Sequence, residues 1–111
     1  MNGLGGIRMK DIVTKELDTA LSHWNAMSRS DQEEAEEMAN AFEAAFYRFI
    51  DALREWVYAL NPRPQTLDEL LEMPFIRDIT DRLPSPLYLN FETEAELIME
   101  NRSRIDDEKY D

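Results

Sequence analysis

Apolar side chains recur every three or four positions from residue 31 to residue 60, which is the period of an amphipathic helix. Met38, Phe42, Phe49 and Trp56 lie on the central stripe, and neighbouring alanine, isoleucine and valine residues widen it. At roughly 100° per residue the apolar arc covers about half of the circumference. The pattern therefore predicts one long helix that packs against at least two other elements.

Local chemistry marks both ends of this helix. Ser30 is followed three residues later by Glu33, the spacing of a capping box that opens a helix. Pro62 cannot donate a backbone hydrogen bond, so it ends the helix near Asn61. Charged side chains such as Arg54 fall inside the span, and charges at bilayer depth are costly, so we do not expect it to cross a membrane.

A first helix is predicted over residues 10–27, where Val13, Leu17 and Trp24 share one face. Only a short connection separates it from the long helix, and short connections make antiparallel neighbours. We therefore expect the first helix to cover the N-terminal half of the long helix, around Phe42. The half around Trp56 needs another cover, which is either the C-terminal region or a second copy of the chain.

The C-terminal region predicts short elements. Thr66 and Glu69 form a second capping box, which opens a short helix ending near residue 72. Pro74 suits the first turn of another short helix, which carries the apolar residues Ile76 and Ile79. The prolines at positions 84 and 86 are expected to end that helix.

After these prolines the apolar pattern changes its period. Leu87, Leu89 and Phe91 alternate with polar neighbours, which predicts a short extended segment. Thr93 and Glu96 form a third capping box, which predicts the start of a final helix.

These elements predict an all-α or mainly α protein: a long antiparallel helical hairpin with short C-terminal helices packed on it, and one short extended segment. We expect a flexible leader over residues 1–9, a single helical domain over residues 10–102 and an acidic tail over residues 103–111. Gly5-Gly6 can be encoded by a sequence resembling a bacterial ribosome-binding site ahead of Met9. Met9 is therefore a second candidate for the native start, in a bacterial or phage gene, and the nucleotide sequence decides between Met1 and Met9.

The composition narrows the classes of partner. The formal net charge is −12, and residues 30–47 contain six acidic side chains with no Lys or Arg. Binding to nucleic acid or to an anionic membrane requires a basic patch, and the sequence has none, so neither partner is expected. The chain has no cysteine, and residues 1–8 contain no secretory apolar run, so a cytoplasmic location is expected.

No residue pattern indicates catalysis, a cofactor or a metal. His23 is the one histidine of the sequence, and it has neither the helical companions of a metal site nor the orienting acid of a general base. Glu33 with Glu37, or Glu36 with Asn40, could share a hard cation, but carboxylates on one helix make a poor cage. We interpret the acidic face of Glu33, Glu36, Glu37 and Glu43 as a solvated surface and predict that the protein is not an enzyme.

A different polar stripe is the candidate partner-binding site. Tyr47, Asp51, Arg54 and Tyr58 are spaced to line up on the side of the long helix opposite the core. Tyr and Arg are enriched at interface hot spots, whereas a purely solvated face usually carries Glu and Lys. The alternative interpretation is that C-terminal elements of the same chain fold over the tyrosines.

The sequence therefore favours a small protein–protein interaction or regulatory module, with a homodimer through the second helix as one form of that interaction. The alternative function is an acidic inhibitor or nucleic-acid mimic that blocks a basic site on an enzyme or a DNA-binding protein. Its binding should be steered by charge and weaken steeply as salt is added. The identity of the partner does not follow from the sequence.

Overall fold

A computed structural model describes residues 9–29, 32–60 and 62–100 of the chain. Of these residues 89% are helical and none forms a strand, so the predicted all-α class is confirmed. The five helices follow in the order α1 (Met9–Arg29), α2 (Gln32–Ala59), α3 (Leu67–Glu72), α4 (Pro74–Arg82) and α5 (Ser85–Met99). The contacts divide the chain into two compact units, Met1–Ala59 and Leu60–Asp111, and each is described by itself. The expectation of a single domain over residues 10–102 stays a prediction.

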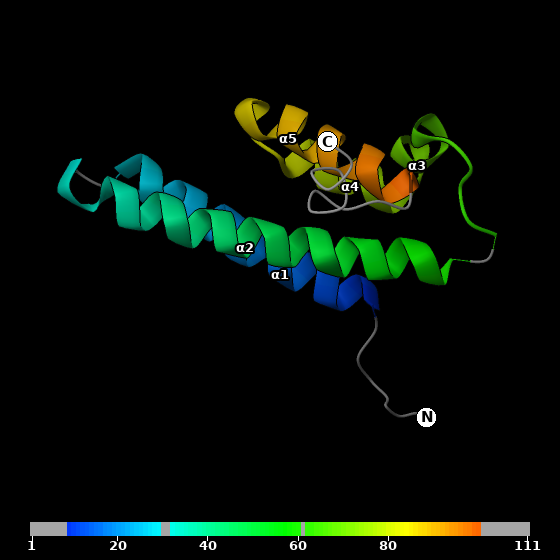
Figure 1. The fold of residues 1–111 in the computed structure, drawn as a ribbon, viewed down its shortest axis with the longest axis horizontal. Helices are drawn as coiled ribbons and strands as arrows, with labels where there is room; N and C mark the ends of the chain where they lie inside the picture. Colours follow the sequence, from blue (N-terminus) through cyan, green and yellow to red (C-terminus); the bar gives the residue numbers. More distant parts are fainter. Residues whose placement is uncertain (1–8, 30–31, 61, 101–111) are drawn as a thin grey trace, which may run out of the picture. The chain divides into compact units, whose positions relative to one another are not determined.

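The first unit is the predicted helical hairpin, with α1 and α2 side by side (Figure 1). Trp24 of α1 contacts Phe42 of α2 with a ring-centroid distance of 5.3 Å, and Arg48 of α2 pairs with Glu16 of α1. Moving forward along α1 from Glu16 to Trp24 therefore means moving backward along α2 from Arg48 to Phe42. The two helices are antiparallel, as the short connection predicts.

The predicted ends of both long helices are close to the observed ends. The first helix, predicted over residues 10–27, begins one residue earlier and ends two residues later. Met9, which was assigned to the flexible leader, is therefore helical. The second helix was predicted over residues 31–60 and runs over Gln32–Ala59. The capping residue Ser30, residues 1–8 and the tail over 103–111 lie outside the described residues.

The core of the hairpin lies along the apolar stripes that the sequence predicts. Val13, Leu17 and Ala20 are buried on α1. The buried residues of α2 are Ala45, Phe46, Phe49, Ile50, Leu53, Trp56 and Val57. Phe49 and Trp56, which the sequence places on the central stripe, are thus core residues.

The capping box at the start of α3 is confirmed. The Thr66 hydroxyl accepts a hydrogen bond from the Glu69 backbone N–H, with an Oγ1–N distance of 3.1 Å. The Glu69 carboxylate in turn accepts from the Gln65 backbone N–H at 2.8 Å. A standard capping box returns this second bond to the cap residue itself, so the reciprocal contact here is displaced by one residue.

Replacing Thr66 with alanine should lower the free energy of unfolding by about 1 kcal/mol, because the first turn of α3 loses its side-chain acceptor. Urea denaturation followed by circular dichroism measures the change. Thr66→Ser keeps the hydroxyl and is the matched control, for which we expect a smaller loss. Equal losses in both variants would mean that the threonine methyl group, rather than the hydrogen bond, matters.

Pro74 occupies the first turn of α4, as predicted, with Met73 as the cap residue between α3 and α4. A proline fits there because the first backbone N–H groups of a helix have no partner within the helix. Ile76 and Ile79 of α4 are buried, and together with Leu70 of α3 they form part of the core of the second unit.

The predicted extended segment is wrong. Leu87, Leu89 and Phe91 belong to α5, and the Leu87 backbone N–H donates to the Pro84 carbonyl at 2.9 Å in its first turn. The prolines at 84 and 86 thus open a helix as well as following the end of α4. The capping box predicted at Thr93 is wrong for the same reason, because Thr93 lies in the interior of α5.

Candidate functional site

The candidate partner-binding stripe lies on α2. Because Tyr47, Asp51, Arg54 and Tyr58 all belong to one continuous helix, their spacing brings them to one side of it. Asp51 is exposed, whereas the two tyrosines and Arg54 are half-buried. The expectation that all four lie opposite the core is therefore met fully by Asp51 and in part by the others.

The Tyr47 ring is held against the core at one edge. Its centroid lies 5.6 Å from that of Phe46, with the two rings edge to face at 74°. Edge-to-face packing of this kind adds stabilisation beyond the buried area. The tyrosine is thus anchored on one side while part of its surface remains accessible.

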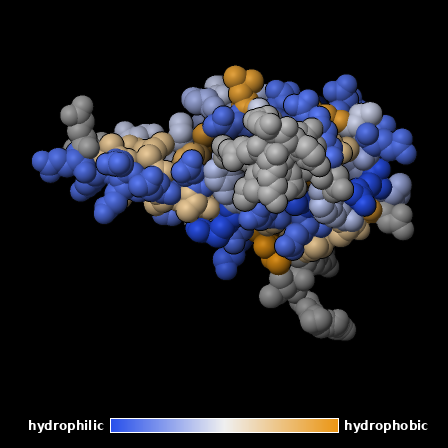
Figure 2. All heavy atoms as spheres, viewed as in Figure 1, coloured by the Kyte–Doolittle hydropathy of each residue, from blue (hydrophilic) through white to orange (hydrophobic). Residues whose placement is uncertain are grey.

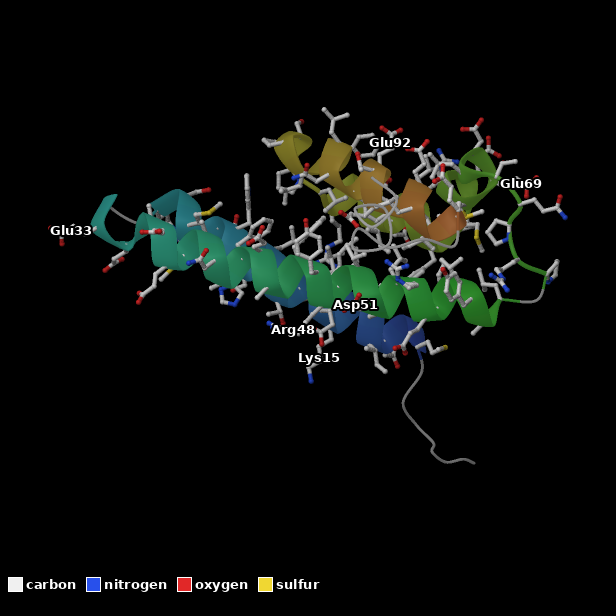
Figure 3. The ribbon with its side chains drawn as sticks, viewed as in Figure 1. Lys15, Glu33, Arg48, Asp51, Glu69 and Glu92 are labelled. Carbon is white, nitrogen blue, oxygen red and sulfur yellow. The ribbon has the colours of Figure 1, made fainter. Side chains whose placement is uncertain are left out.

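The charges near the stripe are paired differently from the simplest helical expectation. Arg48 could pair with Asp51 along the helix, but its Nε lies 3.7 Å from the Glu16 carboxylate on α1. Asp51 forms no ion pair with another described residue. Figure 3 labels Arg48 and Asp51 along α2. Asp51 therefore presents an exposed negative charge beside aromatic and cationic side chains of the same helix.

The acidic face occupies the N-terminal part of α2. Glu33, Glu36, Glu37 and Glu43 are all exposed. Glu33 is labelled at the end of the hairpin in Figure 3. Within the described part of the chain, no group of three or more histidine, aspartate or glutamate side chains could hold a metal ion. His23 is half-buried on α1.

A row of aromatic rings links α1 with α2. The accessibility of the two rings nearest the hairpin turn, those of Trp24 and Phe42, was not predicted from the sequence. Trp24 contacts Phe42, Phe42 contacts Phe46 at 5.8 Å, and Phe46 contacts Phe49 at 5.9 Å. Phe46 and Phe49 are buried, but Trp24 and Phe42 are half-buried. The sequence feature that could have indicated this partial exposure is the width of the apolar arc on α2, because a single partner helix does not cover so wide an arc.

No helix in the described parts of the chain is both long enough and apolar enough to span a membrane. The polar and charged positions along α2, including Arg48, Asp51 and Arg54, break the apolar runs that such a span requires. Comparisons of the chain with protein-family models, with curated proteins and with solved structures found no match.

Proposed function

We propose that this chain is a small protein–protein interaction module of the cytoplasm, which acts by binding a partner protein and not by catalysis. The observation that carries the proposal is the stripe on α2. It combines two half-buried tyrosines, a half-buried arginine and the exposed carboxylate of Asp51. Tyr and Arg are the residue types that most often dominate the free energy of binding at protein interfaces.

The physical basis is the limited freedom of these side chains before binding. Tyr47 is already held by Phe46, so a partner that covers its accessible part needs to restrict it little further. Asp51 offers a charge that selects for a complementary donor on the partner. The stripe thus provides both contact area and specificity.

A site-specific cross-linking experiment tests the proposal. A photoreactive amino acid at position 51, in cells that naturally carry the gene, should capture one protein, which mass spectrometry identifies. The same group at the exposed position 78 on α4 is the control, and should not capture that protein. A product of twice the chain's mass would identify a second copy as the partner.

Replacing both tyrosines of the stripe should then abolish the capture. Tyr47→Ala with Tyr58→Ala removes the aromatic contact area, and circular dichroism should show unchanged helicity. Full capture by this double variant, or the same products from positions 51 and 78, would contradict the role of the stripe.

A second candidate function is an acidic inhibitor or nucleic-acid mimic that blocks a basic site. It is favoured by the exposure of the acidic face of α2, where Glu33, Glu36, Glu37 and Glu43 face solvent. Repeating the capture in a lysate of the same cells at about 0.5 M salt separates the two functions, because screening weakens a contact made by exposed charges. Capture that survives this salt concentration excludes the mimic.

A further inference from the structure

The apolar stripe of the hairpin is continuous, but its burial is not. On α1, Leu17 and Ala20 are fully buried, whereas Trp24, the next member of the same stripe, is half-buried. On α2, Phe49 is fully buried, whereas Phe42 is half-buried. No side chain that the structure describes between Leu21 and Ala44 is fully buried. The apolar core of the hairpin is therefore fully buried far from the turn between α1 and α2, and partly exposed to solvent near that turn.

The ion pair between Glu16 and Arg48 is a reference for the two sides of the hairpin. Glu16 and Arg48 mark one edge of the contact between α1 and α2. At roughly 100° per residue, Leu21 lies on the other side of the α1 stripe from Glu16, and Ala39 lies on the other side of the α2 stripe from Arg48, while Trp24 and Phe42 lie near the middle of their stripes. Leu21, which is half-buried, and Ala39, which is exposed, therefore extend the accessible apolar surface to the side of the hairpin opposite the ion pair.

We name this face the turn-end surface. Its members are Leu21, Trp24, Ala35, Ala39 and Phe42. The contact of 5.3 Å between the Trp24 and Phe42 rings joins the part on α1 to the part on α2. Figure 2 shows pale-orange atoms bordered by blue ones at this end of the hairpin, which is cyan in Figure 1.

Carboxylates border the turn-end surface. Glu36 and Glu43 follow Ala39 around the circumference of α2, and Asp18 follows Leu21 around that of α1. All three are exposed. Glu36 and Glu43 form no ion pair with another described residue. An apolar strip bordered by exposed carboxylates is complementary to an apolar strip bordered by positive charge.

We propose that the turn-end surface binds a basic amphipathic helix of a partner protein. The apolar face of that helix covers Trp24 and Phe42, and its lysine or arginine side chains meet Glu36 and Glu43. A second copy of this chain would bring like charges together, because the net charge is −12. The inference rests on the proposed function, because it assumes that the protein acts by binding another protein. The turn-end surface is nevertheless separate from the Tyr47–Tyr58 stripe.

A synthetic peptide provides the probe. An amphipathic peptide of about 18 residues, with leucines three and four positions apart and lysines elsewhere, should bind the full-length chain in a fluorescence-anisotropy titration. Glu36→Lys with Glu43→Lys should weaken this binding by about tenfold or more, because attraction becomes repulsion.

The matched control changes the same number of charges elsewhere. Asp78→Lys with Asp81→Lys alters two exposed positions of α4, and should change the affinity by less than about twofold. Circular dichroism checks that both double variants remain helical. Equal weakening in the two variants would show that only the overall charge matters and would overturn the proposal.

Three further measurements test the proposed occupant and the independence of this surface from the Tyr47–Tyr58 stripe. A peptide of the same composition but scrambled order cannot form an apolar face, and its binding with equal affinity would overturn the proposal. Sedimentation should show that the chain does not form a dimer that the peptide dissociates. A dimer dissociated by the peptide would mean that a second copy of the chain occupies the surface. Tyr47→Ala with Tyr58→Ala should leave peptide binding unchanged. Failure of the peptide to bind thus overturns this inference without testing the stripe.

Discussion

Replacing Trp56 with alanine should lower the free energy of unfolding by roughly 3–5 kcal/mol, the usual cost of removing a large aromatic side chain from a core. Trp56 is 6% exposed and lies on the α2 stripe with Leu53, which is fully buried. The variant loses the transfer free energy of the indole and leaves a cavity that the surrounding helices fill only in part. Urea denaturation followed by far-ultraviolet circular dichroism measures the loss without relying on tryptophan fluorescence.

The second tryptophan of the chain is the natural comparison. Trp24 is half-buried against Phe42, so Trp24→Ala removes less surface from a dry environment and should cost only about 1–2 kcal/mol. A cost below about 1 kcal/mol for Trp56→Ala would mean that Trp56 is exposed in solution. It would then become a candidate for a contact with a second copy.

The two long helices could be predicted from the sequence because each presents its apolar period over many turns. Val13, Leu17 and Ala20 on α1 and Phe49, Leu53 and Trp56 on α2 are the buried residues that the spacing indicates. A long regular pattern leaves no competing interpretation. The start of α3 was also predictable, because a capping box is a local interaction that needs only Thr66 and Glu69.

The α5 helix could not be recognised from the short window that suggested a strand. Leu87, Leu89 and Phe91 fit alternation, and five residues do not distinguish the two periods. Over a longer window the buried residues Leu87, Phe91, Ala95 and Ile98 follow helical spacing. Prolines were interpreted as a stop, although the first turn of a helix accepts them because its N–H groups need no partner within the helix.

The candidate stripe was predictable in its alignment but not in its exposure. Helical spacing places Tyr47, Asp51, Arg54 and Tyr58 on one side of α2 whatever else the chain does. A helical wheel shows one helix alone and not the other parts of the chain near its side chains. It could therefore not show that three of the four residues are half-buried. The partial opening of Phe42 escaped prediction for the same reason.

Replacing Phe91 with alanine should lower the free energy of unfolding by roughly 3–5 kcal/mol, whereas Leu89→Ala should change it by less than about 0.5 kcal/mol. Phe91 has 0% of its surface exposed and Leu89 has 68%. The two positions lie on opposite sides of a helix but on the same face of a strand. The pair of variants therefore tests directly whether residues 87–91 are helical in solution.

A third variant makes the test independent of side-chain size. Leu89→Pro should cost about 3 kcal/mol or more, because proline inside a helix removes a backbone hydrogen bond and clashes with the preceding turn. Leu89→Ala keeps the backbone donor and is its control. If this segment were an exposed edge strand, Leu89→Pro could be tolerated, and Leu89→Ala and Phe91→Ala would have similar costs. A large loss of unfolding free energy for Leu89→Pro together with a small loss for Leu89→Ala is therefore expected only if this segment is helical.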